Sequence, residues 1–132
     1  MPRSDGARPL SDRVRVRHML DAARQAAAFV AGRARYELDT DHMLRRALKD
    51  CVQEIGEAAS RVSDEGRARA PGLPWKQIVG MRHRIVHVYY DIDADALWTV
   101  AVRDLPVLEA ALEAALNAWP DERGGDRGNP VP

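Results

Sequence analysis

The hydrophobic positions of this chain recur at intervals of three and four residues, which is the spacing of amphipathic helices. Four main helices are expected, over residues 12–32, 41–62, 74–90 and from 94 onward. The segment 63–73, between the second and third helices, is rich in charge, glycine and proline and is expected to be a loop. The pattern therefore predicts an all-α fold, a four- to five-helix up-and-down bundle.

Two residues that disfavour helices fall inside the expected helices. Gly56 lies within the apolar stripe of the second helix, where glycine costs about 1 kcal/mol relative to alanine. Its presence indicates the close approach of another helix. Pro106 is expected to kink or break the last helix, and Asp104 becomes a new N-cap if the helix breaks.

The composition fits close-packed helices in a single domain. The chain has 132 residues, of which 45% are hydrophobic and only 5% aromatic. The folded domain is expected over residues 11–119, with a disordered N-terminus at 1–10 and a disordered tail at 120–132. The formal net charge is zero, which argues against bulk electrostatic binding of nucleic acid, so any RNA contact requires a local basic patch.

The single cysteine and the short apolar runs argue against two classes of protein, those held by disulfides and those that span a membrane. Cys51 falls in register with the apolar stripe of the second helix and is expected to be buried. One cysteine allows no internal disulfide, which fits a reducing cytoplasm. The longest apolar run, residues 26–31, is too short for a membrane span. No metal or cofactor is expected, because His83 and His87, four residues apart, have no further identifiable ligand.

One charged residue of the third helix falls where an apolar residue is expected. With Ile78 taken as zero and about 100° per residue, Arg82 lies at about 40°, inside the apolar arc. A charge there is costly unless it is paired, so Arg82 is either a structural arginine with a partner or a functional group. His87 lies about 140° from Arg82 on an ideal helix. The two side chains can meet only if the helix end is distorted or a symmetric dimer apposes two copies.

Four segments around Arg82 together resemble the signature of a known family. The first is the pattern Arg-x4-His-x-Tyr, formed by Arg82, His87 and Tyr89. The others are the preceding segment 74–81 with the following Tyr90-Asp91-Ile92-Asp93, the upstream Ile55-Gly56-Glu57-Ala58-Ala59 and the downstream Asp104-Leu105-Pro106. In this order they resemble the HepT-like HEPN-domain toxins of HepT–MntA toxin–antitoxin systems, over about residues 11–118. One departure is His83, at a position where family members often carry asparagine.

The resemblance implies a symmetric homodimer with its active cleft at the interface, and a type VII-like toxin that cleaves RNA without metal. In such cleavage the 2′-hydroxyl of the RNA attacks the neighbouring phosphorus, which requires a proton-transfer group and a fixed cation. His87 is expected to transfer protons and Arg82 to stabilise the phosphoryl oxygens. His83 is expected as a supporting donor and Arg84 at the edge of the groove. Glu57 either orients Arg82 or a partner chain, or is an ordinary surface carboxylate.

The resemblance also implies a partner and a mode of regulation. In HepT-type systems an MntA-like nucleotidyltransferase antitoxin transfers AMP to the motif tyrosine. Tyr89 is the matching position, and the adjacent Tyr90 is the second choice. AMP at Tyr89 would add negative charge and bulk beside the cleft and exclude the RNA phosphate.

Two other functions remain open at the level of the sequence. The chain could be a non-catalytic HEPN binding module that partners a nucleotidyltransferase, or a purely structural four-helix subunit. The intact Arg82, His87 and Tyr89 count against the structural subunit, since a relaxed motif should have lost at least one of them.

Overall fold

The computed structural model describes residues 10–86 and 91–120, and these residues form an all-α fold, as the sequence predicts. The helical segments are α1 (Asp12–Val30), α2 (Glu37–Thr40), α3 (His42–Ser60), α4 (Asp64–Ala68), α5 (Trp75–Val79), α6 (Met81–Ile85), α7 (Ala94–Thr99), the π-helical turn η2 (Val100–Asp104) and α8 (Leu105–Asn117). The disorder expected at 1–9 and 121–132 lies outside the described residues. Among the helices that are described, none is both long and apolar enough to cross a membrane.

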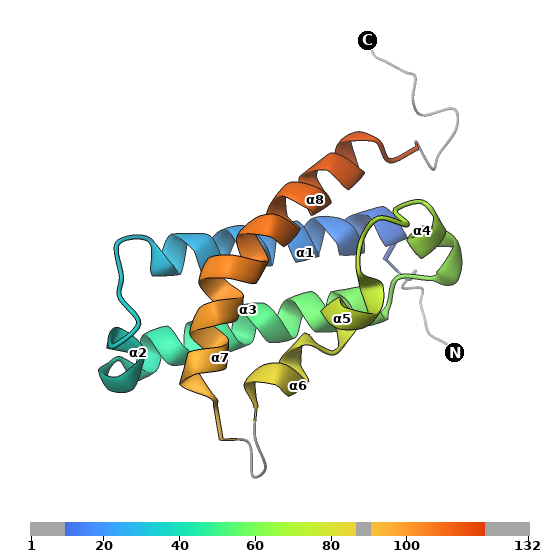
Figure 1. The fold of residues 1–132 in the computed structure, drawn as a ribbon. Coiled ribbons are helices and arrows are strands. Elements are labelled where there is room, and N and C mark those ends of the chain that lie inside the picture. The colour runs from blue at the N-terminus through green and yellow to red at the C-terminus, as the bar shows by residue number, and fades with distance from the viewer. Residues whose placement is uncertain (1–9, 87–90, 121–132) are drawn as a thin grey trace, which may run out of the picture.

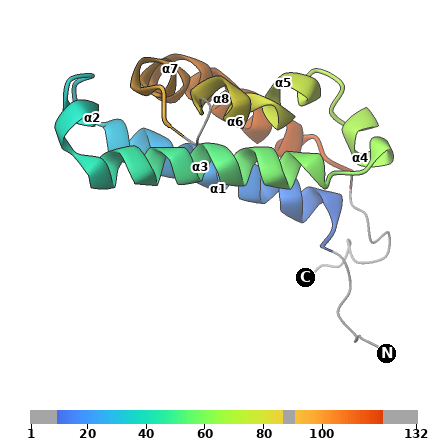
Figure 2. The same cartoon turned by 90° about the horizontal axis from the view of Figure 1, so that it is seen from below.

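The helices are arranged in two layers. Figure 1 shows α1 and α3 running antiparallel beside each other, and Figure 2 shows α5, α6, α7 and α8 together above this pair. The consecutive helices α5 and α6, called the α5–α6 arm below, pack against α3. α8 instead crosses α1. Val86 and Ile92 form an isolated antiparallel bridge, and Asp93 N–H donates to the carbonyl of Ile85 at 2.8 Å. These contacts hold the end of α6 against the start of α7.

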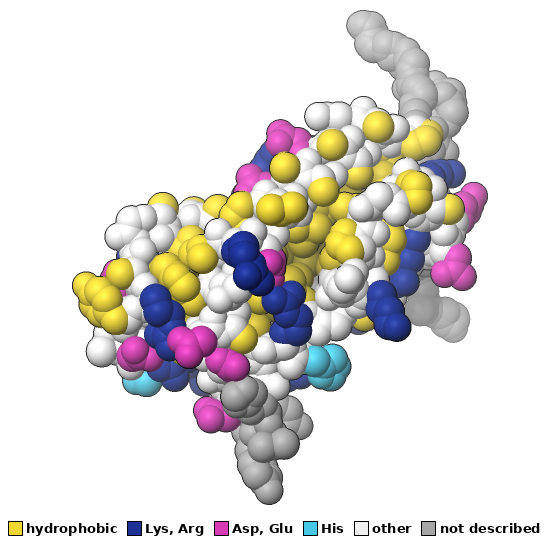
Figure 3. Space-filling model, in the orientation of Figure 1, with side chains coloured by type: hydrophobic (Ala, Val, Ile, Leu, Met, Phe, Trp, Pro, Cys, Tyr) yellow, Lys and Arg dark blue, Asp and Glu magenta, His cyan; other side chains and the backbone are white. Residues whose placement is uncertain are grey.

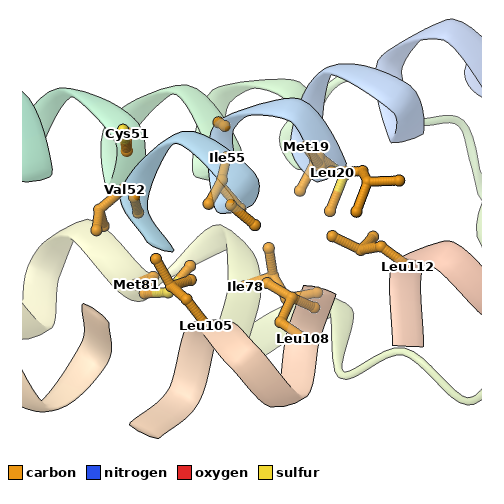
Figure 4. Close-up of a cluster of buried hydrophobic side chains, with 14 of the residues drawn as sticks. Met19, Leu20, Cys51, Val52, Ile55, Ile78, Met81, Leu105, Leu108 and Leu112 are labelled. Carbon is orange, nitrogen blue, oxygen red and sulfur yellow. The ribbon is translucent and has the colours of Figure 1, made fainter. Parts of the chain in front are cut away.

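A single hydrophobic core lies between the two layers. Its central side chains, shown in Figure 4, are Met19 and Leu20 of α1, Cys51, Val52 and Ile55 of α3, Ile78 of α5, Met81 of α6, and Leu105, Leu108 and Leu112 of α8. The predicted burial of Cys51 is confirmed, since its exposed fraction is 2%. Burial raises the pKa of the Cys51 thiol to about 11, so this cysteine is a protonated, unreactive core residue at neutral pH.

The expected loop 63–73 contains a short helix, α4, which the sequence pattern did not indicate. Ser63 caps it by accepting a hydrogen bond from Gly66 N–H at 3.0 Å. Asp12 at the start of α1 accepts from both Ser63 N–H, at 3.0 Å, and Ser63 Oγ, at 2.5 Å. Arg67 lies over the ring of Trp75, with its guanidinium carbon 5.5 Å from the ring centroid, and donates to the carbonyl of Ala59 at 3.0 Å. Contacts to α1, α3 and α5 therefore order this segment.

An ion-pair cluster fixes the corner between α1 and α3. Arg33 bonds to Glu37 and to Asp41, each at 2.6 Å. Glu37 also accepts from Ala34 N–H at 2.7 Å, and Asp41 caps α3 by accepting from Leu44 N–H at 3.0 Å. The pKa of each carboxyl group is lowered, first by its backbone hydrogen bond and then by Arg33.

This cluster predicts a loss of stability in acid. A carboxyl group whose pKa is lower in the folded than in the unfolded chain stabilises the fold at neutral pH, and this contribution is lost as the pH falls through the folded pKa. We therefore expect the melting temperature to fall progressively below about pH 4, where free carboxyl groups begin to protonate. Thermal melts followed by circular dichroism between pH 7 and pH 2.5 would measure this. In Arg33→Met the decline should be shallower, and an equal decline in both proteins would contradict the assignment to this corner.

Candidate functional site

The segment that carries Arg82 is two short helices rather than the single helix predicted over residues 74–90. α5 ends at Val79, and Gly80 separates it from α6. His83 N–H donates to the carbonyl of Gly80 at 3.0 Å, three residues back, which starts a new helix. The angular position of Arg82 relative to Ile78, derived for a continuous helix, is therefore wrong. Met81 and Ile85 are the buried residues of α6, and Arg82 is half-buried beside them.

Gly56 marks the place where the α5–α6 arm packs against α3. A Cβ atom built on Gly56 would lie 3.5 Å from the carbonyl oxygens of both Ile78 and Val79. The end of α5 thus rests on the surface of α3 at the one position that has no side chain. The close approach predicted from Gly56 is confirmed, and it sets the position of Gly80 and of the α6 residues that follow.

Arg82 lines an open cavity of about 380 Å³ between α3 and the α5–α6 arm. The other residues that line it are Gln53, Gly56, Glu57, Ser60, Val79 and His83. No hydrogen bond or ion pair joins the Arg82 side chain to any other described residue. The structure thus brings Arg82, His83 and Glu57 together at one cavity. Within the described part of the chain, the guanidinium of Arg82 has donors available for a ligand.

Glu57 is exposed on the α3 side of this cavity. Its carboxylate accepts a long hydrogen bond of 3.4 Å from Gln53 Nε2, and no described contact joins it to Arg82. The expectation that Glu57 orients Arg82 therefore stays a prediction. Glu57 also borders a second cavity of about 230 Å³, lined in part by Arg15, His18 and Arg61.

The second cavity is lined by side chains of both charges. Arg15 and His18 come from α1 and Arg61 from the end of α3, and they face Glu54 and Glu57 of α3. Arg24, further along α1, instead pairs with Glu113 and Glu109 of α8 at 3.2 and 3.8 Å. The arginines of α1 thus serve two different surfaces, which the sequence pattern could not separate.

Arg84 lies apart from Arg82 and His83. Its guanidinium donates to Asp104 at 2.8 Å, and Asp104 also accepts from Arg103 at 3.1 Å. Burial alone would raise the pKa of Asp104, but hydrogen bonds from these two arginines outweigh it and hold this pKa below its usual range. Asp104 stands at the N-cap position of α8, as conditionally expected, but its side chain makes no capping hydrogen bond there and instead joins α6 to η2.

Arg84 and Asp104 also line a more apolar cavity of about 340 Å³ with Ile78, Met81 and Val107. Figure 3 shows the hydrophobic side chains that gather between α8 and the α5–α6 arm, with basic side chains at the margin. The placement of Arg84 at the groove edge stays a prediction, because the cavity it lines is not the one that holds Arg82.

Three predicted site residues, His87, Tyr89 and Tyr90, lie outside the described residues. α6 ends at Ile85, and Val86 is extended, with φ −120° and ψ 125°. The helical angle of about 140° between Arg82 and His87 therefore does not apply. Among the residues the structure does describe, no group of three or more His, Cys, Asp or Glu side chains could hold a metal ion.

Comparison with known proteins places this arrangement in a family. Residues 19–115 match the family described as ribonuclease HepT-like. The chain belongs to this family. The matched span runs from α1 to α8 and includes every residue that lines the Arg82 cavity, so the HepT-like assignment covers this cavity.

Individual relatives of this HepT-like chain carry similar names. A Methanocaldococcus jannaschii protein whose name describes it as a candidate RNase is 30% identical over 95 residues, which cover 72% of this chain and 87% of that protein. A Caldanaerobacter subterraneus protein with the same kind of name is 32% identical over 76 residues, or 58% of this chain and 68% of that protein. A Thermococcus cleftensis protein named probable ribonuclease HepT is 27% identical over 73 residues, which cover 55% of this chain and 66% of that protein. No solved structure matches the chain.

Proposed function

We propose that this HepT-like chain is a metal-independent endoribonuclease and the toxin of a type VII-like toxin–antitoxin system. The observation that carries the proposal is the half-buried Arg82, which has no described partner and lines a cavity large enough for a nucleotide. The donors of Arg82 are therefore available to a ligand that enters this cavity. The family and the names of the relatives support an RNA substrate.

In the proposed reaction the 2′-hydroxyl of RNA attacks the adjacent phosphorus, and the 5′-oxygen of the next nucleotide leaves. Arg82 stabilises the negative charge that develops on the phosphoryl oxygens. His87, five residues further along the chain, accepts the proton of the 2′-hydroxyl or donates one to the leaving oxygen.

The proposal includes a homodimer and a regulatory partner. A two-fold axis beside α6 would bring two copies of Arg82 and His87 around one cleft. An MntA-like nucleotidyltransferase would neutralise the toxin by transferring AMP to Tyr89, or to Tyr90, and the added negative charge would repel the RNA phosphate.

Expression in bacteria without the nucleotidyltransferase tests the proposal. We expect the unmodified chain to arrest growth and degrade RNA, and His87→Ala to do neither, because no group then moves the proton. His42→Ala removes an exposed histidine at the start of α3 and should behave as the unmodified chain does. The purified protein should cleave RNA equally with and without EDTA.

Failure of the soluble chain to cleave RNA would contradict the ribonuclease. If the chain then still formed a stable complex with a co-expressed nucleotidyltransferase, its function would be that of a non-catalytic binding module. Loss of cleavage in EDTA, restored by a divalent cation, would contradict the metal-independent mechanism alone.

A further inference from the structure

The cavity that holds Arg82 has two chemically different walls. α6 supplies Arg82 and His83, which are hydrogen-bond donors, and the arginine carries a positive charge. α3 supplies Gln53, Glu57 and Ser60. A ligand that contacts both walls needs an anionic group on the α6 side and hydrogen-bond donors on the α3 side.

The hydrogen bonds within α3 make its wall one mainly of acceptors. Ser60 Oγ donates its hydrogen to the carbonyl of Glu57 at 2.7 Å, so the hydroxyl offers a ligand only its lone pairs. The amide nitrogen of Gln53 donates one hydrogen to Glu57 Oε2 at 3.4 Å, so Gln53 offers a ligand its Oε1 as an acceptor and one remaining N–H. The carboxylate of Glu57 only accepts hydrogen bonds.

A phosphate group does not fit beside Glu57, because two negative charges would repel each other. The phosphate of an RNA therefore belongs at the α6 wall, and a group that donates hydrogen bonds belongs at the α3 wall. Val79 lines the same cavity and is exposed, so it offers an apolar side chain on which a flat ring can rest. Single-stranded RNA presents such a ring, with donors on its edge, next to every phosphate.

We infer that the α3 wall recognises the base next to the scissile phosphate, and that Glu57 selects guanine. This inference rests on the proposed ribonuclease function. Guanine presents two adjacent donors, N1–H and N2–H, which match the two oxygens of a carboxylate. Adenine and cytosine present one amino group beside an acceptor nitrogen. Uracil presents N3–H between two carbonyl oxygens, which the acceptors of α3 would repel. The expected order is guanine first, then adenine and cytosine, and uracil last.

The test is cleavage of a single-stranded RNA pool with a randomised sequence, followed by sequencing of the new ends. We expect cuts next to guanine to exceed cuts next to uracil by about tenfold, which is within the range that one bidentate contact to a base contributes. In Glu57→Gln the total cleavage should persist, but the ratio of guanine to uracil should fall to within about threefold, because the amide presents a donor in place of one acceptor.

Glu54→Gln is the matched control. Glu54 is an exposed carboxylate one turn earlier on α3, and it lines the cavity with Arg15 and not the one with Arg82. The same loss of charge at Glu54 should leave the base preference unchanged. Thermal melts of both variants show whether the fold is retained.

Each other outcome of this experiment has a definite meaning. Cleavage by the unmodified chain with no base preference would overturn the inference and leave the ribonuclease in place. Absence of cleavage at every sequence would contradict the proposed ribonuclease function, and the inference that rests on it would also be wrong. Complete loss of cleavage in a folded Glu57→Gln would also overturn the inference, because it would place Glu57 in the chemical step.

Discussion

Arg82→Ala is expected to lower the rate of RNA cleavage by about 10²- to 10³-fold, which is the usual effect of removing one preorganised donor from a developing oxyanion. The fold should be retained, because Arg82 makes no hydrogen bond or ion pair to another described residue. Arg82→Lys keeps the charge but loses the planar pair of donors, so its cleavage rate should lie between those of the unmodified protein and Arg82→Ala. Single-turnover cleavage of a labelled RNA, with melting temperatures measured in parallel, gives both quantities.

Arg46→Ala provides the control for this experiment. Arg46 is an exposed arginine of α3 that lines none of the cavities described above, so its loss changes the net charge by the same amount. Its cleavage rate should stay within about twofold of the unmodified protein, since exposed charges away from a site have small effects. A folded Arg82→Ala that cleaves RNA at the unmodified rate would exclude Arg82 from the chemistry.

The largest loss of stability is expected from Gly66→Ala. A Cβ atom at Gly66 would lie 2.6 Å from Cγ and 2.8 Å from Cβ of Asp12, and its nearest contact would be Asp12 Oδ2. Asp12 cannot move away without losing its hydrogen bonds to Ser63, which caps α4. Overpacking of this kind costs about 1–3 kcal/mol. Since alanine gains about 1 kcal/mol of helix propensity, the net loss is up to about 2 kcal/mol, and the melting temperature should fall by up to about 8 °C.

Gly56→Ala is the matched comparison, because it is the same substitution in another buried helical glycine. Its Cβ atom would meet the Ile78 and Val79 carbonyls at 3.5 Å, an ordinary contact distance. The melting temperature should stay the same or rise, by the equivalent of up to about 1 kcal/mol. If the melting temperature of Gly66→Ala is unchanged when it is measured beside Gly56→Ala, the prediction is wrong. Asp12 and Ser63 would then move apart without a loss of stability.

The features that the sequence could predict depend on contacts close along the chain. The apolar stripe of α3 requires only a period near 3.6 residues, so the helix and the burial of Leu48, Cys51 and Ile55 followed directly from it. Ser11 caps α1 by accepting a hydrogen bond from Val14 N–H, a contact between residues three positions apart. Gly56 indicated a close neighbour correctly, but it could not say that the neighbour is the end of α5.

The features that the sequence could not predict depend on partners far along the chain. α4 is held by Asp12, 51 residues before Ser63, and the break at Gly80 lies where the end of α5 rests on α3. The ion pair of Arg84 with Asp104 likewise joins separate helices. For the candidate site, the helical spacing singled out Arg82, and the family resemblance added His83 and Glu57. The presence of all three at one cavity depends on how α3 and α6 pack, which periodicity does not specify.

The π-helical turn η2 keeps the hydrophobic stripe of the last helical arm in phase. The stripe consists of Leu97, Ala101, Leu105, Leu108, Leu112 and Leu116. Its five steps average about 3.8 residues, so on a regular helix of 3.6 residues per turn the stripe would drift by about 100° over its length. η2 contains a wider turn, in which Leu105 N–H donates to the carbonyl of Val100, and it absorbs the extra residue. Deleting one residue from Val100–Asp104 would therefore rotate Leu108 and Leu112 out of the core, and the length of this short segment is as constrained as its sequence.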